Sequence, residues 1–154
     1  MKKIMPPLIA VVLLAASSLV RADSQATDNT PQAAMQATKK AIVTRNMILT
    51  ADQGKVFWPL YDQYQIEQNK LNAERMAILT KFSINYDNLT DELVRDLLDK
   101  SLTLEKKRVN LKLEWMDKFN KVLPPKVVAR YYQIENKLEA TVANELAQQI
   151  LLAK

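Results

Sequence analysis

The side chains of this chain that could do chemistry are carboxylates, amines, hydroxyls and phenols, because its 154 residues include no histidine and no cysteine. Histidine is the commonest general base and the commonest metal ligand, so its absence removes most acid–base and zinc chemistry. A nucleophile paired with histidine is impossible within one such chain. The chain also lacks a glycine-rich loop of the kind that cradles nucleotide phosphates. We therefore predict a protein that is not an enzyme and holds no cofactor.

Four carboxylates cluster where a helix is predicted to begin: Asp91, Glu92, Asp96 and Asp99. A divalent-cation site is one interpretation of this cluster. The spacing is not that of a calcium-binding loop, however, and acids near a helix start complement the helix dipole without any ion. We therefore predict no metal site.

Basic side chains form a second cluster, in the middle of the third predicted helix: Lys106, Lys107, Arg108 and Lys112. Three acids interleave with them, which is typical of a solvated helix face. The alternative is a cationic patch on a concave surface, where these four residues attract acidic clients or partners. The sequence leaves both interpretations open.

Four aromatic residues surround Pro59 within a helical pattern: Phe57, Trp58, Tyr61 and Tyr64. Phe57, Tyr61 and Tyr64 recur at three- and four-residue steps, so we assign their shared face to the core. Trp58 lies roughly 100° round the helix from Phe57, and we predict that it faces a client or partner. The alternative is a plain core at a helix bend. Because proline removes one backbone hydrogen bond, we expect a kink or break near Trp58.

The elements that must position these residues are helices. A single glycine, Gly54, argues against a sheet protein, because tight turns between strands use glycine. Abundant Leu, Ala, Lys, Gln and Glu favour an all-α fold with four helices. Periodicity and cap residues place these helices at roughly 32–47, 51–82, 91–122 and 125–150, with the third in a central position.

The third predicted helix is apolar over a wider arc than one core requires. One row holds Leu97, Leu104, Leu111 and Trp115. A second row holds Leu98, Leu102, Val109, Leu113 and Met116. Each leucine left in water forgoes roughly 1.5–3 kcal/mol of burial free energy. The second row calls for a cover, which is another part of the same chain, a second copy or a client. Since the chain is small, we favour a second copy and predict that the protein is a homodimer.

The first 22 residues are typical of a cleaved secretory signal peptide, with Lys2 and Lys3 ahead of an apolar run and Val20-Arg21-Ala22 at the cleavage site. The run is short and contains two prolines, so we expect no stable membrane insertion after cleavage; an uncleaved anchor is the alternative. We expect a disordered leader at 23–31 and one helical domain at 32–152. Cleavage lowers the formal net charge from +5 to about +2, because three basic residues leave, and this argues against nucleic-acid binding.

The second predicted helix opens with the segment Leu49-Thr50-Ala51-Asp52-Gln53. Thr50 and Gln53 have the spacing of a capping box, in which each side chain binds a backbone N–H group of the other residue. The segment matches an LTxxQ box, and in this position it resembles the Spy/CpxP-like family of bacterial periplasmic proteins, whose members carry two such boxes. At the second box this chain has Leu123-Pro124-Pro125-Lys126-Val127, in which only the leucine is kept.

The resemblance covers roughly residues 32–152 and implies a periplasmic, cradle-shaped antiparallel homodimer of four-helix chains. It implies a chaperone or envelope-stress adaptor that binds unfolded or partly folded envelope proteins without ATP. Some relatives instead repress a membrane sensor kinase through its periplasmic domain, so a regulatory subunit is the alternative function. Metal-sensing members of the family use histidine-rich tails. We do not extend metal sensing to this chain, because it has no histidine.

Overall fold

The structure, a computed structural model, describes residues 31–150 and residue 152, with side chains from residue 33 onward. The predicted signal peptide and the leader up to residue 30 lie outside the described residues. Within them the fold is all-α: α1 spans Pro31–Asn46, α2 Ala51–Ile84, α3 Asp91–Asn120 and α4 Pro125–Gln149, with a short 3-10 helix, η1, at Tyr86–Asn88. No strand occurs in this part of the chain. The predicted fold class is confirmed.

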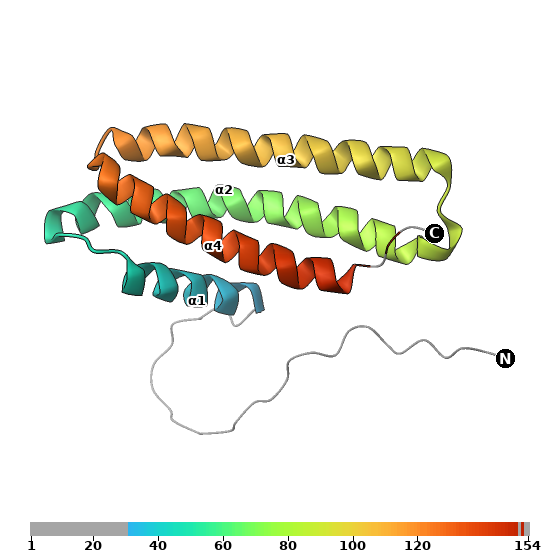
Figure 1. The fold of residues 1–154 in the computed structure, drawn as a ribbon, viewed down its shortest axis with the longest axis horizontal. Helices are drawn as coiled ribbons and strands as arrows, with labels where there is room; N and C mark the ends of the chain where they lie inside the picture. The colour runs from blue at the N-terminus through green and yellow to red at the C-terminus, as the bar shows by residue number, and fades with distance from the viewer. Residues whose placement is uncertain (1–30, 151, 153–154) are drawn as a thin grey trace, which may run out of the picture.

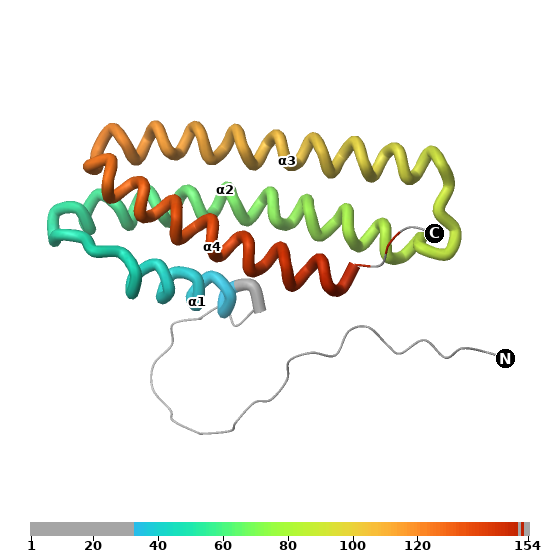
Figure 2. The backbone as a smooth tube through the Cα atoms, viewed as in Figure 1, coloured from blue at the N-terminus to red at the C-terminus, as the bar shows by residue number. Residues whose placement is uncertain are grey.

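The two longest helices, α2 and α3, form an antiparallel hairpin (Figure 1). From the end of α3, α4 runs back across the hairpin, and α1 packs along α4. Figure 2 shows that the α1–α2 and α3–α4 connections lie together at one end of the bundle, while the α2–α3 connection lies at the other. We call these the turn end and the hairpin end.

The helices begin at the residues that the cap signals predict. The Thr50 and Thr90 side chains accept hydrogen bonds from the backbone N–H groups of Gln53 and Leu93, each at 3.2 Å. Pro125 is the first residue of α4, where its missing N–H group has no helical partner to lose. The ends of α3 and α4 fall one or two residues earlier than predicted.

The sequence predicts a kink or break near Phe57–Trp58; helix α2 continues through Pro59 without interruption, so the break is wrong. Proline cannot donate to the carbonyl group of Lys55, one turn earlier. Both residues are exposed, and water can bind that carbonyl in place of the lost donor. Phe57 and Tyr61, on either side of Pro59, are buried in the core, so packing fixes the chain before and after the proline.

The core lies at the turn end, where all four helices meet. Phe57, Tyr61 and Tyr64 are buried there, as predicted, beside Val43 of α1. Further buried core residues come from α3, α4 and the turn between them: Trp115, Phe119, Leu123, Val128 and Tyr131. Toward the hairpin end, the buried apolar residues of the described chain are Leu97 and Leu104. None of the helices within residues 31–150 combines the length and the apolar character needed to cross a membrane.

Candidate functional site

The first motif box is a structural cap at the turn end. The Gln53 N–H group donates to Thr50 Oγ1 at 3.2 Å, and the Thr50 N–H group donates to Gln53 Oε1 at 3.1 Å. The predicted capping box is therefore present. Leu49, which precedes it, packs against the core.

The second, degenerate box lies at the same end of the bundle. Leu123 is buried in the core, and Pro124 occupies the cap position of α4 without a side-chain hydrogen bond. The backbone N–H group of Val127 donates to the Pro124 carbonyl at 2.9 Å. The two prolines thus set the helix start through backbone geometry alone, whereas the first box does so through side chains.

An open groove of about 410 Å³ separates the two boxes. Its lining comes from Met47 and Ile48, between α1 and α2, and from Lys126, Val127 and Arg130 in the first turns of α4. We call it the turn groove. Ile48 is 74% exposed, whereas Met47 beside it is buried.

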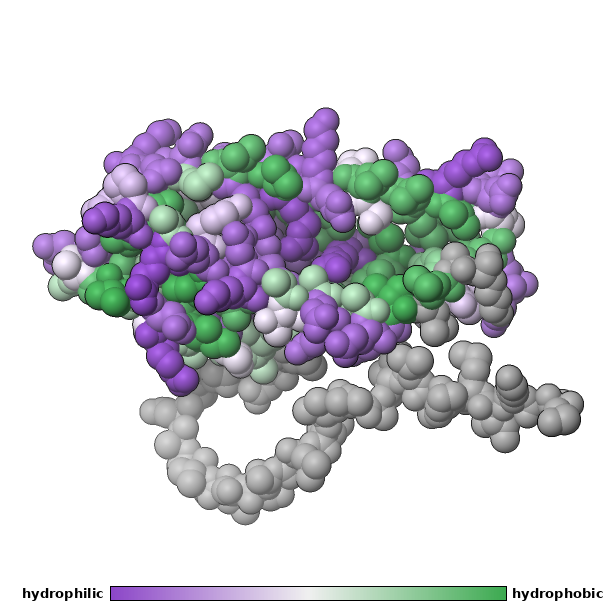
Figure 3. Space-filling view, viewed as in Figure 1, coloured by the Kyte–Doolittle hydropathy of each residue, from purple (hydrophilic) through white to green (hydrophobic). Residues whose placement is uncertain are grey.

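Four apolar residues of α3 share one uncovered face: Leu98, Leu102, Val109 and Leu113. Each is more than half exposed in the single chain, and helical geometry places all four within roughly 60° of the helix circumference. We call them the α3 stripe. Figure 3 shows apolar surface over the upper edge of the bundle, where α3 runs, interrupted by hydrophilic side chains.

Met116, the fifth residue of the predicted interface, belongs elsewhere. It is half-buried and packs against the core, near Val128 and Tyr132 of α4. The start of α4 covers this part of α3, so Met116 lies outside the α3 stripe.

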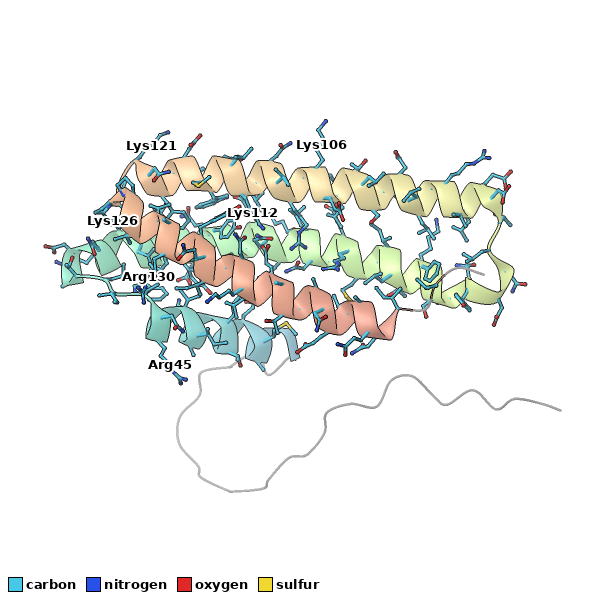
Figure 4. The ribbon with its side chains drawn as sticks, in the orientation of Figure 1. Arg45, Lys106, Lys112, Lys121, Lys126 and Arg130 are labelled. Carbon is cyan, nitrogen blue, oxygen red and sulfur yellow. The ribbon has the colours of Figure 1, made fainter. Side chains whose placement is uncertain are left out.

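The four basic residues of α3 do not form one patch. Lys107 pairs with Glu74 of α2 at 2.8 Å, and both Arg108 and Lys112 pair with Glu139 of α4. Of the four, Lys106 makes no ion pair within the described chain. In Figure 4 it points away from the bundle, whereas Lys112 points into it. The predicted cationic patch is therefore wrong, because consecutive residues point in different directions and neighbouring helices supply acids.

Trp58 does not project freely either. Its ring is half-buried, with the centroid 4.9 Å from that of Phe57 and 5.5 Å from that of Tyr61. The Lys40 Nζ atom of α1 lies 5.6 Å from the ring centroid. The predicted client-facing tryptophan is thus corrected to a residue at the edge of the core, because α1 lies beside this face of α2.

Buried polar side chains lie within the core, and the sequence interpretation missed them. Glu135 of α4 is 1% exposed and pairs with Lys39 of α1, while its Oε2 atom has no hydrogen-bond partner. Two buried glutamines of α2 make separate hydrogen bonds in the same core. Gln65 donates to Tyr131 Oη at 3.3 Å, and Gln68 donates to Glu139 Oε1 at 3.2 Å.

Burial, and after it the nearby negative charge of Glu135, raises the pKa values of three phenols well above their usual range: Tyr61, Tyr64 and Tyr131. The sequence does carry one signal for the buried carboxylate of Glu135. Tyr131, Glu135 and Leu138 recur at four- and three-residue steps along the core-facing row of α4, so a carboxylate occupies an otherwise apolar row.

The arrangement as a whole offers exposed apolar surface and charge rather than convergent reactive groups. No three metal-ligating side chains come together within the described part of the chain. Several cations at the turn end lack an acidic partner there: Arg45, Lys121, Lys126 and Arg130. Comparisons with protein-family models, with curated proteins and with solved structures give no match to this chain.

Proposed function

We propose that the chain is an ATP-independent periplasmic chaperone or envelope-stress adaptor that binds partly unfolded proteins. The observation that carries the proposal is the amount of apolar surface left uncovered along the α2–α3 hairpin. Besides the α3 stripe, Ile66, Met76 and Ile84 of α2 are at least half exposed. Apolar side chains that share one exposed face, as in the α3 stripe, are a recognised mark of interaction surfaces.

The charged residues around this exposed apolar surface suit transient binding of client proteins. Ion pairs such as Lys81–Asp96 and Lys107–Glu74 link α2 to α3 at the surface and place charged groups on the same hairpin as the exposed apolar side chains. Apolar burial is non-directional, and it therefore accepts clients of varied sequence. Flanking charges steer the encounter and keep the free protein soluble.

We also infer that the protein is a homodimer in which a second copy covers the α3 stripe. In that arrangement the exposed residues of α2 remain available for clients. The resemblance to the Spy/CpxP-like family, carried by Leu49, Thr50 and Gln53, supports the same function and the same assembly.

The test is suppression of aggregation for two unrelated enzymes that aggregate on heating, without ATP. We expect protection at close to one chain per client. Ile66→Ser combined with Met76→Ser should reduce protection at least several-fold. The matched control is Gln63→Ser combined with Thr80→Ser, which changes exposed polar residues of the same helix and should leave protection unchanged. Failure to protect either enzyme, together with saturable binding to one membrane sensor domain, would favour the regulatory subunit instead.

A further inference from the structure

The turn groove has the form of a binding site for one short segment. Its base is apolar, with Met47 buried and Val127 half-buried, and the exposed Ile48 stands at its edge. A volume of about 410 Å³ is within the range of pockets that hold small ligands or a few residues of peptide. The groove is therefore large enough for an aliphatic side chain together with the backbone on either side of it.

Arg130 lines this groove, and a hydrogen bond fixes its guanidinium group. Its Nε atom donates to the Asn46 carbonyl at 2.7 Å, which ties the guanidinium to the end of α1. The two terminal nitrogens have no partner among the described residues. A guanidinium fixed through Nε presents a planar fork that matches a carboxylate with two parallel hydrogen bonds.

Lys126 adds a second positive charge one helical turn from Arg130, on the same face of α4. It too forms no ion pair with any described residue. In Figure 4 Lys126 and Arg130 lie at the turn end, between Arg45 on one side and Lys121 on the other. A ligand in the groove would thus meet one tethered cation, Arg130, and one exposed cation, Lys126, and would not have to displace an acid from either.

The whole turn end carries excess positive charge. Segments 45–56 and 119–130 contain five basic residues and a single acid, Asp52. Asp52 pairs with Lys55 at 2.8 Å, so it does not neutralise the groove. A positive field of this kind raises the encounter rate with acidic partners.

We propose that the turn groove binds an extended acidic segment of a partner protein, with a carboxylate on Arg130 and an adjacent aliphatic side chain over Met47, Ile48 and Val127. An anionic membrane surface fits less well. A flat surface would touch Ile48 but could not reach the recessed Met47, whereas a side chain can enter the groove. This site is separate from the hairpin surface of the proposed chaperone function, and either can fail without the other.

The experiment titrates the full mature chain with a labelled eight-residue peptide of alternating leucine and glutamate, followed by fluorescence anisotropy. The control peptide replaces each glutamate by glutamine. We expect the acidic peptide to bind at least about tenfold more tightly, because its carboxylates can form charge-assisted bidentate bonds. Arg130→Gln should weaken acidic-peptide binding at least about tenfold. The matched control Lys106→Gln, an equal loss of charge on exposed α3, should change binding less than twofold.

Circular dichroism shows whether Arg130→Gln folds. If it does not, Lys126→Gln combined with Ile48→Ser serves instead, since neither side chain contributes a hydrogen bond to the fold, and the same tenfold loss is expected. Equal binding of the two peptides would overturn the proposal, as would equal losses in the groove variant and Lys106→Gln. Binding to vesicles containing phosphatidylglycerol that depends on Arg130, with no peptide binding, would assign the groove to a membrane surface and would also overturn it.

Discussion

Lys39 of α1 forms an ion pair with Glu135 of α4, and these two residues are 96 positions apart in the sequence. The Glu135 side chain is almost fully buried, whereas that of Lys39 retains some contact with solvent. Lys39 pairs with Oε1 of Glu135, and Oε2 has no hydrogen-bond partner. The lysine is therefore the main compensation for burying this charge, and it fastens a short N-terminal helix to the last helix of the bundle.

Removal of Lys39 should be costly. Lys39→Met leaves the buried carboxylate without its cation, and we expect a loss of about 3 kcal/mol in the free energy of unfolding. The double variant Lys39→Met with Glu135→Leu should recover most of that loss, because no charge then remains buried. Urea denaturation followed by circular dichroism measures both.

The control for this pair is Lys40→Met, one residue away. Lys40 pairs with Asp62 at 2.6 Å, but both side chains are about half exposed. An exposed pair contributes only about 0–1 kcal/mol. Equal losses for Lys39→Met and Lys40→Met would show that burial of Glu135 does not control the energetics.

The buried phenols predict a loss of stability at alkaline pH. Their pKa values are raised in the folded state, chiefly by burial, while an unfolded tyrosine titrates near about 10. Above that pH the unfolded chain releases protons that the folded chain retains, so the free energy of unfolding falls as pH rises. Urea midpoints at about pH 8 and about pH 11 should differ accordingly. Tyr61→Phe should reduce the difference, and an unchanged difference in that variant would remove Tyr61 as a contributor.

The capping box predicts a small, non-additive loss of stability. Thr50→Ala should cost about 0.5–2 kcal/mol, because the Gln53 N–H group loses its acceptor. Gln53→Ala should cost less. The double variant should fall short of the sum, since both side chains serve one helix end. Full additivity in chemical denaturation would argue against reciprocal capping.

The α3 stripe predicts a homodimer that charge can disrupt. Leu102→Lys combined with Val109→Lys places two cations on the proposed interface and should shift the protein toward monomer in sedimentation equilibrium. Ile66→Lys introduces a cation at an equally exposed residue of α2 and should leave the assembly unchanged. A wild-type chain that stays monomeric at high micromolar concentration would contradict the assignment.

Substitutions of Phe57 and Trp58 should lower the free energy of unfolding by different amounts, even though both residues touch the core. Phe57 is fully buried, so Phe57→Ala should cost about 3–5 kcal/mol. Trp58 is half-buried with two ring contacts, and Trp58→Ala should cost roughly 1–2 kcal/mol. Thermal and urea unfolding of the two variants check the order. Equal costs would place Trp58 fully within the core.

The starts of α2, α3 and α4 were predictable from the sequence because their causes are local. Thr50 and Gln53 lie three residues apart, and Pro125 acts through its own ring, so the signal and its effect occupy the same turn. The core face of α2 was predictable for the same reason, since Phe57, Tyr61 and Tyr64 follow helical spacing.

The features that were missed depend on contacts between distant segments. Nothing near Glu135 in the sequence indicates that Lys39 will reach it. Likewise, the acids that pair with Lys107 and Lys112 belong to other helices, so a run of positive charge in the sequence became separate ion pairs. The turn groove requires the α1–α2 connection to lie beside the start of α4, which periodicity within a single helix cannot predict.

The off-centre core has a consequence for how the molecule opens. At the turn end, three helices supply the buried aromatic residues and α1 adds Val43, whereas the hairpin end relies on two buried leucines and on surface contacts such as the hydrogen bond from Tyr86 Oη to the Leu152 carbonyl. Local opening takes the least free energy where few apolar contacts must be broken. Backbone amides near 76–84 and 91–96 should therefore exchange with solvent deuterium well before those near 57–64 and 115–131. We therefore expect the hairpin end to open locally while the turn end stays folded.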